Sequence, residues 1–369
     1  MKEYLNHHQY LSYALLASSS ILISLIAIPS IIHVSKLHQL YDDLSTHRKS
    51  HSQGIPRLGG IAIFVSFTIT LLLFGNADTA IPINYLLASC ILMFAMGIKD
   101  DLSGVNPGTK IVLQFLAAMI LVIPGKIRLT NLYGLFDIYE LNAISSIILS
   151  VLFIMFITNA FNLIDGIDGL AASTGILVNG SFSVLFIYMR QLELATVSLT
   201  MTGAILGFIR FNLSPAKIFM GDTGSLLIGL ISSVMALKFI SLEEAPGTFN
   251  QLYATPAIAI VILMGPISDT IRVLLIRTSK GTSPFRADRN HTHHMMLRLG
   301  LTHLQATSIL LSINMTGILL AIAFVKYGNA TIITYSIIAY ILFNWITSLI
   351  IKLKTPDPHT IKQAEPLNS

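Results

Sequence analysis

Three polar residues recur at every third position near the middle of the chain, where an apolar run ends. Asn162, Asp165 and Asp168 lie within TNAFNLIDGIDGLAAS (residues 158–173), so a helical or near-helical backbone would place them on one stripe. Gly166 and Gly169, each directly after an Asp, let the backbone approach a ligand closely. An Asp at the centre of a membrane helix costs about 2.5–3.5 kcal/mol, so these carboxylates indicate a functional site. The alternative is a loop in which the Asp residues cap free N–H groups.

Two adjacent carboxylates, Asp100 and Asp101, end an earlier apolar run. Because adjacent carboxylates repel each other, a bound cation or a basic partner nearby best explains such a pair. Lys110 follows a few residues later and is a candidate substrate contact. The simpler interpretation is a solvated helix end with Lys99 and Lys110 as neighbours.

Asp222 stands in FMGDTGS (residues 219–225), where another apolar run begins. A carboxylate at a helix start can hold a metal ion against a phosphate group, because the neighbouring N–H groups point the same way. The alternative is that Asp222 is only the N-cap of that helix.

Two segments are dense in cations. The first, residues 46–64, contains Lys49, His51 and Arg57 and serves either to bind an anion or only to anchor the chain at the membrane surface. The second, residues 277–303, crowds two Arg and three His residues into nine positions: Arg286, Arg289, His291, His293 and His294. Zinc is the alternative ligand for the His residues, but the neighbouring Arg side chains would repel a metal ion and suit a phosphate group.

The elements that carry these residues are membrane helices. Of the 369 residues, 53% are hydrophobic and 11% are charged, against about 25% charged in an average soluble protein. Eleven apolar runs are long enough to cross a bilayer core of about 30 Å, namely residues 11–34, 58–75, 83–98, 110–124, 141–160, 169–189, 194–213, 223–240, 252–274, 305–325 and 330–351. We therefore predict an all-α polytopic membrane protein with about eleven transmembrane helices. Residues 1–351 would form a single catalytic domain and residues 352–369 a cytoplasmic polar tail.

Local features refine this prediction. Pro256 and Pro266 predict a kink or a break in the ninth run. Broken backbone at membrane depth is tolerated where it lines a cavity, so this run is our candidate for a lateral lipid groove. Residues 126–140 predict a short hairpin around Tyr133 and Gly134. The lone Cys90 excludes disulfides and Cys-based metal sites within this sequence.

The basic residues predict the orientation in the membrane. Seventeen of the 23 Lys and Arg residues fall in one set of loops, which the positive-inside rule places in the cytoplasm. The N-terminus is then outside, the C-terminus is in the cytoplasm, and the active site faces the cytoplasm. The net charge of +5 is mostly this bias plus one basic loop, so we expect no nucleic-acid partner.

Four loops on the predicted cytoplasmic face supply carboxylates and amides, and two of them add dense cations. Mg²⁺ is usually held by one or two carboxylates plus substrate phosphates, so this combination suits Mg²⁺ together with a diphosphate. Catalysis of phosphoryl transfer is then mainly positioning and charge neutralisation. A cation-coupled transporter and a scaffold without chemistry are the alternatives from other classes.

Five segments, in the family's order, resemble motifs of the polyprenyl-phosphate N-acetylhexosamine-1-phosphate transferase superfamily. They are PRLGG (56–60), KDD (99–101), NAFNLIDGIDGL (159–170), FMGDTGS (219–225) and ADRNHTHH (287–294). The eleven-run topology is similar to the branch that makes undecaprenyl-diphosphate N-acetylglucosamine. The phospho-MurNAc-pentapeptide transferases, with ten spans and a differently spaced His motif, form the alternative branch.

The resemblance implies that a lipid phosphate attacks the β-phosphorus of a UDP-sugar, giving lipid-diphosphate-sugar and UMP. The expected partners are a UDP-N-acetylhexosamine, here UDP-GlcNAc, and undecaprenyl phosphate, and the expected oligomer is a homodimer. The expected location is the bacterial inner (plasma) membrane. There the reaction would be the first membrane step of a cell-envelope polysaccharide such as lipopolysaccharide O-antigen or teichoic acid.

The resemblance also implies roles for individual residues. Mg²⁺, or Mn²⁺ in its place, would be held by Asp222, Asp100 and Asp165. The uridine and diphosphate pocket would be lined by Asn162, Asp165 and Asp168, with Phe219 beside the nucleobase. Phosphate and sugar would be bound by Arg286, Arg289, His291, His293 and His294. The catalytic set would comprise Asp100, Asp101, Asp165, Asp168 and the three His residues.

The chain departs from the family in one segment. Many members have a Lys where this chain has Ser52 and Gln53, so Lys49, His51 or Arg57 is expected to supply that charge.

The acceptor needs little help from a general base. A phosphate monoester has a second pKa near 6, so the lipid phosphate is already largely deprotonated at pH 7. We therefore expect Asp100 and Asp101 to act mainly by holding charge and metal in place.

Overall fold

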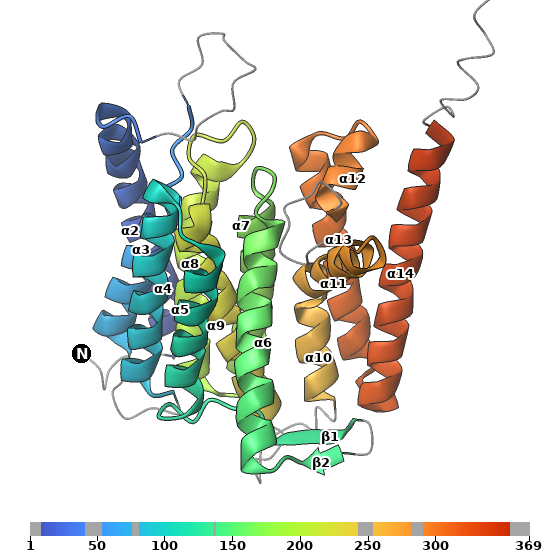
Figure 1. Cartoon of the computed structure of the whole chain (residues 1–369). Coiled ribbons are helices and arrows are strands. Elements are labelled where there is room, and N and C mark those ends of the chain that lie inside the picture. Colours follow the sequence, from blue (N-terminus) through green and yellow to red (C-terminus); the bar gives the residue numbers. More distant parts are fainter. Residues whose placement is uncertain are drawn as a thin grey trace, which may run out of the picture.

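The computed structural model describes residues 9–40, 54–75, 81–135, 138–242, 254–281 and 291–354. In these ranges the chain is a bundle of helices that run side by side, with a small two-stranded sheet at one end (Figure 1). The helices are α2 (Gln9–Leu37), α3 (Gly59–Phe74), α4 (Ile83–Ser103), α5 (Pro107–Val122), α6 (Ala143–Ile164), α7 (Leu170–Tyr188), α8 (Leu192–Asn212), α9 (Gly221–Ser241), α10 (Thr255–Ile262), α11 (Met264–Ser279), α12 (Thr292–Arg298), α13 (His303–Ala323), η2 (Val325–Tyr327) and α14 (Gly328–Lys354).

Each of the eleven predicted runs overlaps a helix, the ninth run overlapping α10 and α11 together. Within the described residues, eight helices are long and apolar enough to cross a membrane, or nine if the bent pair α10–α11 is one span. Helices α3 and α5 are apolar but have only 16 residues each. A helix of that length spans about 24 Å, less than the bilayer core. The prediction of a polytopic membrane protein is confirmed, and the count of eleven spans stays a prediction.

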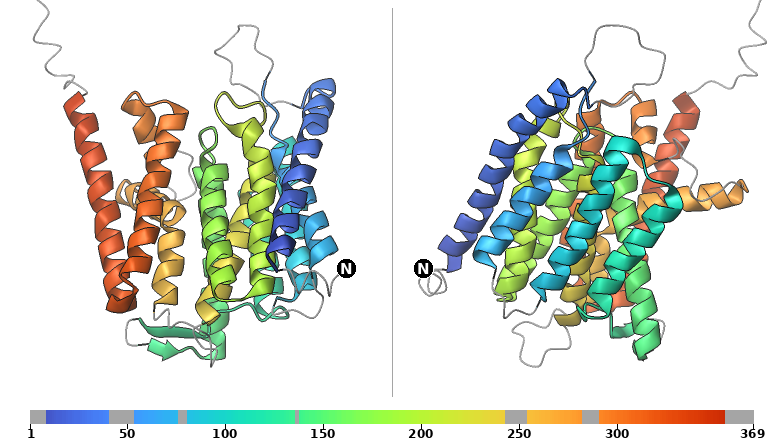
Figure 2. Two further views of the ribbon diagram at one scale, coloured as in Figure 1. Left: turned by 180° about the vertical axis from the view of Figure 1, so that it is seen from behind. Right: turned by 60° about the vertical axis from the view of Figure 1, so that its left-hand side comes forward.

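The ninth run is broken, as its prolines predicted. The axes of α10 and α11 meet at 70° at Leu263, and α11 runs across the direction of the other helices (Figure 2). Pro266 has no N–H group to donate to the carbonyl of Ile262. That carbonyl instead accepts a hydrogen bond from Asn314 Nδ2 of α13 at 3.2 Å. The side chain of α13 therefore satisfies the backbone group that the break exposes.

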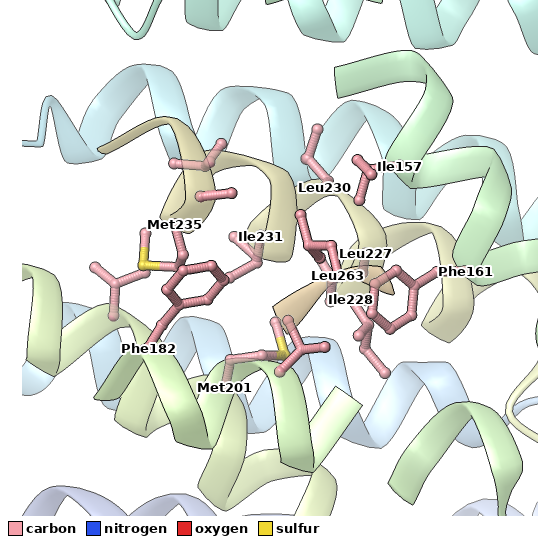
Figure 3. Packing of buried hydrophobic residues seen from close by; sticks show 14 of the residues in the cluster. Ile157, Phe161, Phe182, Met201, Leu227, Ile228, Leu230, Ile231, Met235 and Leu263 are labelled. Atoms are coloured by element: carbon pink, nitrogen blue, oxygen red, sulfur yellow. The ribbon is translucent and has the colours of Figure 1, made fainter. Parts of the chain in front are cut away.

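Helix α9 lies at the centre of the bundle, in contact with α3, α4, α6, α7, α8 and α10. Its side chains are buried along nearly its whole length. A helix that is apolar on all sides has no face for solvent, which is why it takes the central position. Phe161 of α6, Phe182 of α7 and Met201 of α8 belong to the apolar core around it (Figure 3). Because Asp222 stands in the first turn of α9, the core fixes the place of this carboxylate.

The predicted hairpin is present, but its predicted turn is wrong. Strands β1 (Asn131–Leu135) and β2 (Ile138–Glu140) pair antiparallel, so the chain is mostly helical rather than all-α. Tyr133 and Gly134 lie inside β1, where their positive φ values of 53° and 76° interrupt the ladder. The Tyr133 hydroxyl donates to the carbonyl of Ile240 at the end of α9. This contact ties the hairpin to the end of the bundle that lies opposite Asp222.

The C-terminal boundary also differs from the prediction. Helix α14 continues to Lys354, beyond the predicted domain end at residue 351. The rest of the predicted tail lies outside the described residues.

Candidate active site

The predicted polar residues gather at one end of the bundle, opposite the small sheet (Figure 1). Helices α4 and α6 end there, and helices α5 and α9 begin there. Segments that are far apart in the sequence thereby bring four side chains together: Asp100, Lys110, Asn162 and Asp222.

Lys110 is the centre of this cluster. Its Nζ lies 3.1 Å from Asp100 Oδ2 and 3.4 Å from Asn162 Oδ1, and it also contacts Asp222 Oδ2. Asn162 Nδ2 in turn donates to Asp222 Oδ1 at 2.9 Å and to Ser225 Oγ at 3.0 Å. Two carboxylate oxygens and one amide oxygen therefore converge on a single positive charge in a partly buried place.

Asp101, the neighbour of Asp100 in α4, caps the start of α9 from another helix. Its Oδ1 accepts from the backbone N–H of Asp222 at 2.7 Å, and its Oδ2 accepts from the backbone N–H of Thr223 at 3.0 Å. The Thr223 hydroxyl donates to the same Oδ2 at 2.6 Å. Asp222 is therefore not the N-cap of its own helix. A carboxylate of α4 takes that role, and a negative charge there also matches the helix dipole.

The PRLGG and FMGDTGS motifs bind each other through their backbones. The N–H of Phe219 donates to the carbonyl of Pro56 at 2.8 Å, and the N–H of Gly60 donates to the carbonyl of Met220 at 2.8 Å. A Cβ atom on Gly60 would lie 2.2 Å from the backbone N of Gly224. Gly221 has a φ of +72°, and a Cβ atom there would lie 2.2 Å from the carbonyl O of Arg57. These glycines are needed because the two backbones touch.

Asp165 stands at the end of α6, beside the same carboxylates. Its pKa is raised to about 7, first by burial and then by the negative charges of Asp222 and Asp101. The guanidinium of Arg57 opposes this shift, so the PRLGG segment contributes a positive charge next to Asp165. Asp165, Asp222 and Asp101 thus repel one another, and a cation would relieve this repulsion.

Asp168 does not lie on one helical stripe with Asn162, so the prediction made from their three-residue spacing is wrong. Helix α6 ends at Ile164, before the Asp165–Gly169 turn. The Asp168 carboxylate accepts from the N–H of Ala216 at 3.3 Å and lies 3.4 Å from His303 Nδ1. Asp168 therefore links the central loop to the segment after α8 and to the start of α13.

The His residues lie against the central loop. His293 packs on Gly166, where a Cβ atom would be 2.2 Å from the ring Nε2. The rings of His291 and His294 lie 5.4 Å and 4.3 Å from that of His293. His293 is buried, which lowers its pKa to about 3, so this imidazole is neutral at physiological pH. Its Nε2 has no hydrogen-bond partner in the part of the chain that the structure describes.

Several site residues were not predicted from the sequence. Thr223 and Ser225 belong to a motif that was recognised, but the sequence does not reveal that their side chains bind Asp101 and Asn162. His303 stood at the edge of the basic loop and carried no distinguishing signal. Four predicted residues lie outside the described ranges, and their roles stay predictions: Lys49, His51, Arg286 and Arg289.

Comparison with known proteins agrees with this arrangement. A family model described as glycosyl transferase family 4 matches residues 83–240, which contain Asp100, Asn162 and Asp222. The undecaprenyl-phosphate alpha-N-acetylglucosaminyl 1-phosphate transferase of Pasteurella multocida is 36% identical over 272 residues, covering 72% of this chain and 73% of that relative. The probable undecaprenyl-phosphate N-acetylglucosaminyl 1-phosphate transferase of Bacillus subtilis is 32% identical over 301 residues, covering 81% of each chain.

The undecaprenyl-phosphate alpha-N-acetylglucosaminyl 1-phosphate transferase of Escherichia coli K12 is 31% identical over 271 residues, covering 72% of this chain and 71% of that relative. The family that the five motifs predicted is thereby confirmed. The chain belongs to glycosyl transferase family 4, the polyprenyl-phosphate N-acetylhexosamine-1-phosphate transferases.

Proposed function

We propose that this chain transfers GlcNAc-1-phosphate from UDP-GlcNAc to undecaprenyl phosphate, releasing UMP and forming undecaprenyl-diphosphate-GlcNAc. The observation that carries the proposal is the convergence of Asp100, Asn162 and Asp222 on one cationic centre. It occurs in a chain whose relatives carry the name of this activity. The product would start a cell-envelope polysaccharide, and the oligomer we expect is a homodimer.

The donor set fits Mg²⁺, and Mn²⁺ in its place. Carboxylate and amide oxygens are hard ligands of the kind these ions prefer. Asp100 and Asp222 already surround the ammonium group of Lys110, so this place accommodates a positive charge, and Asp165 adds a further carboxylate beside it. When bound, the ion would neutralise the diphosphate and polarise its oxygens.

The chain's own residues would mainly hold and neutralise charge. An oxygen of the lipid phosphate forms a bond to the β-phosphorus of UDP-GlcNAc, and the bond from that phosphorus to the bridging oxygen breaks. UMP leaves with the electron pair of that bond. Lys110 and Arg57 would offset the negative charge, and Asp101 would keep Asp222 in place through the start of α9. Because the acceptor is already deprotonated near pH 7, no step requires Asp100 or Asp101 as a base.

The remaining predicted contacts belong to the same proposal. Phe219 would lie beside the nucleobase, and the loops that contain Lys49, His51, Arg286 and Arg289 would bind phosphate and sugar. His291, His293 and His294 would bind the same groups.

The orientation in the membrane is part of the proposal. Among the described residues, Arg57, Lys110 and Arg210 lie at the same end of the bundle as the site, and basic loops stay in the cytoplasm. We propose eleven spans, an external N-terminus and a site that faces the cytoplasm of a bacterial inner membrane. UDP-sugars are made in that compartment, so the donor would reach the site directly.

The acceptor's prenyl chain has a candidate place beside the broken helix. An apolar groove of about 790 Å³ lies between α13 and α14, with Val261 of α10 at its wall. Ile313 and Tyr340 line both this groove and a small cavity that contains Asp269 and His293. The two spaces are neighbours, which supports a lipid whose apolar chain occupies the groove and whose phosphate points to the site.

The test is release of radiolabelled UMP from uridine-labelled UDP-GlcNAc by the purified protein in lipid nanodiscs. We expect release only with both undecaprenyl phosphate and Mg²⁺ or Mn²⁺, and none from Asp222→Asn. Comparing UMP release from UDP-GlcNAc, UDP-GalNAc and UDP-MurNAc-pentapeptide shows which sugar is transferred. Preference for UDP-MurNAc-pentapeptide would favour the phospho-MurNAc-pentapeptide transferase branch. Ion uptake into vesicles without UMP release would favour a transporter, and neither activity would favour a scaffold.

A further inference from the structure

A buried carboxylate outside the proposed cation site holds the His segment. Asp269, on α11 just after the break, is only 5% exposed. Its Oδ2 lies 2.7 Å from Nδ1 of His291, and its Oδ1 accepts from the backbone N–H of Thr292 at 2.6 Å. Two successive residues at the start of α12 are therefore attached to one side chain of α11.

These contacts set the tautomer of His291. A backbone N–H donor stabilises the ionised form of the carboxylate, and an ionised carboxylate can only accept hydrogen bonds. The proton of the His291 ring must then reside on Nδ1, which leaves Nε2 as the only ring nitrogen that a ligand can use. Without this partner, a free imidazole exchanges between two tautomers and two orientations.

The position of α12 is fixed from a second direction as well. The Thr292 hydroxyl lies 3.2 Å from Asn344 Oδ1 of α14, and the ring of His293 packs on Gly166, next to Asp165. Asp269 thus connects the broken helix to the loop that carries the central carboxylates.

A metal ion is the competing interpretation, because donor atoms of Asp269, His291 and His293 lie within 4.8 Å of one another. Two ligands about 2.0–2.1 Å from a tetrahedral zinc ion would be about 3.3 Å apart. The Asp269–His291 separation of 2.7 Å is instead that of a hydrogen bond. The second carboxylate oxygen is already satisfied by Thr292.

We propose that Asp269 is a positioning residue that holds His291 in the Nδ1–H tautomer and in one orientation, so that the unprotonated Nε2 is presented as an acceptor to an O–H or N–H group of the substrate's sugar. This inference rests on the proposed function for the nature of the ligand. The hydrogen bond and the tautomer do not depend on it.

The kinetic test is a double-mutant cycle of UMP release with Asp269→Asn, His291→Gln and the double variant. If Asp269 acts through His291, Asp269→Asn lowers activity at least about tenfold, and the double variant is no worse than His291→Gln. Losses that multiply would mean an independent role and overturn the proposal. Ser268→Ala is the matched control, because within the described residues its hydroxyl donates to Gly265 of the same helix, and it should keep wild-type activity.

The direct test is ¹⁵N NMR of histidine-labelled wild-type protein, with the His291 signals identified by their absence in His291→Gln. We expect Nδ1 to be protonated in the wild type and in Ser268→Ala, and a mixture of tautomers in Asp269→Asn. Protonation at Nε2 in the wild type, or one equivalent of zinc in the purified protein by mass spectrometry, would overturn the proposal.

The tautomer and the zinc content decide the case even where Asp269→Asn does not fold, since neither measurement needs that variant. If the wild type releases no UMP, the proposed function is wrong. The NMR experiment still tests the His291 tautomer independently of that outcome.

Discussion

Replacing Asp101 by Asn separates a positioning role from a direct catalytic one. Asp101 accepts three hydrogen bonds from the start of α9, at 2.7, 3.0 and 2.6 Å. Each hydrogen bond to a charged group contributes about 1.5–3 kcal/mol, and a negative charge at a helix start about 0.3–2 kcal/mol. Asn keeps one acceptor, turns its amide N–H groups toward the other donors and removes the charge. We therefore expect a loss of about 2–4 kcal/mol, a fall in Tm on the order of 3–5 °C.

Thermal melting by circular dichroism in detergent, together with UMP release, is the assay. Thr223→Val keeps the shape and removes one of the three hydrogen bonds, so it should lose about 1–2 kcal/mol. Asp222→Asn removes the charge beside Lys110 but leaves the three hydrogen bonds of Asp101 in place, so it should melt above Asp101→Asn and lose activity. If Asp101→Asn melts like the wild type yet has no activity, Asp101 contacts cation or substrate directly and the capping interpretation is refuted.

Three further predictions follow from single contacts. Gly60→Ala would place a Cβ atom 2.2 Å from the backbone N of Gly224, so it should lower the free energy of unfolding by about 1–3 kcal/mol or more, seen as a lower Tm. Gly108→Ala, whose Cβ atom would meet nothing closer than 3.8 Å, should leave the Tm unchanged. In EDTA, the folded-state pKa of Asp165 is raised from 3.8 to about 7, so its favourable contribution to stability is complete below pH 3.8 and is lost as the pH rises to about 7. Asp165→Asn should remove this fall in Tm between about pH 4 and pH 7, and an unchanged fall would contradict it. Ala339→Trp, in the α13–α14 groove, should raise the KM for undecaprenyl phosphate several-fold and leave that for UDP-GlcNAc unchanged; an unchanged lipid KM would exclude the groove.

The helices could be predicted because the information for them is local. A run of apolar residues must become a helix in a membrane, since no other single segment satisfies its own backbone there, and every predicted run overlaps a helix. The break at Leu263 was predicted for a similar reason, because Pro266 removes one backbone donor. The span count was not settled, because α3 and α5 have 16 residues each and lie near the limit for crossing.

The parts of the site that could not be predicted depend on contacts between distant segments. That Asp101 caps α9 depends on how α4 packs against α9, and Asp168 meets His303 only in the fold. The hairpin turn was misplaced because Tyr133 takes a positive φ that a bulky residue seldom adopts. Conversely, the grouping of Asp100, Asn162 and Asp222 followed from residue type and position alone, because carboxylates at the ends of apolar runs need a cation.

If these carboxylates form a divalent-cation site, Mn²⁺ binding followed by electron paramagnetic resonance will detect it without any turnover. For purified protein with UDP-GlcNAc and without acceptor lipid, we predict one bound Mn²⁺ per chain in the wild type and at least about tenfold weaker binding in Asp222→Asn. Equal Mn²⁺ affinity in the two proteins, or no bound Mn²⁺ in the wild type, would contradict it.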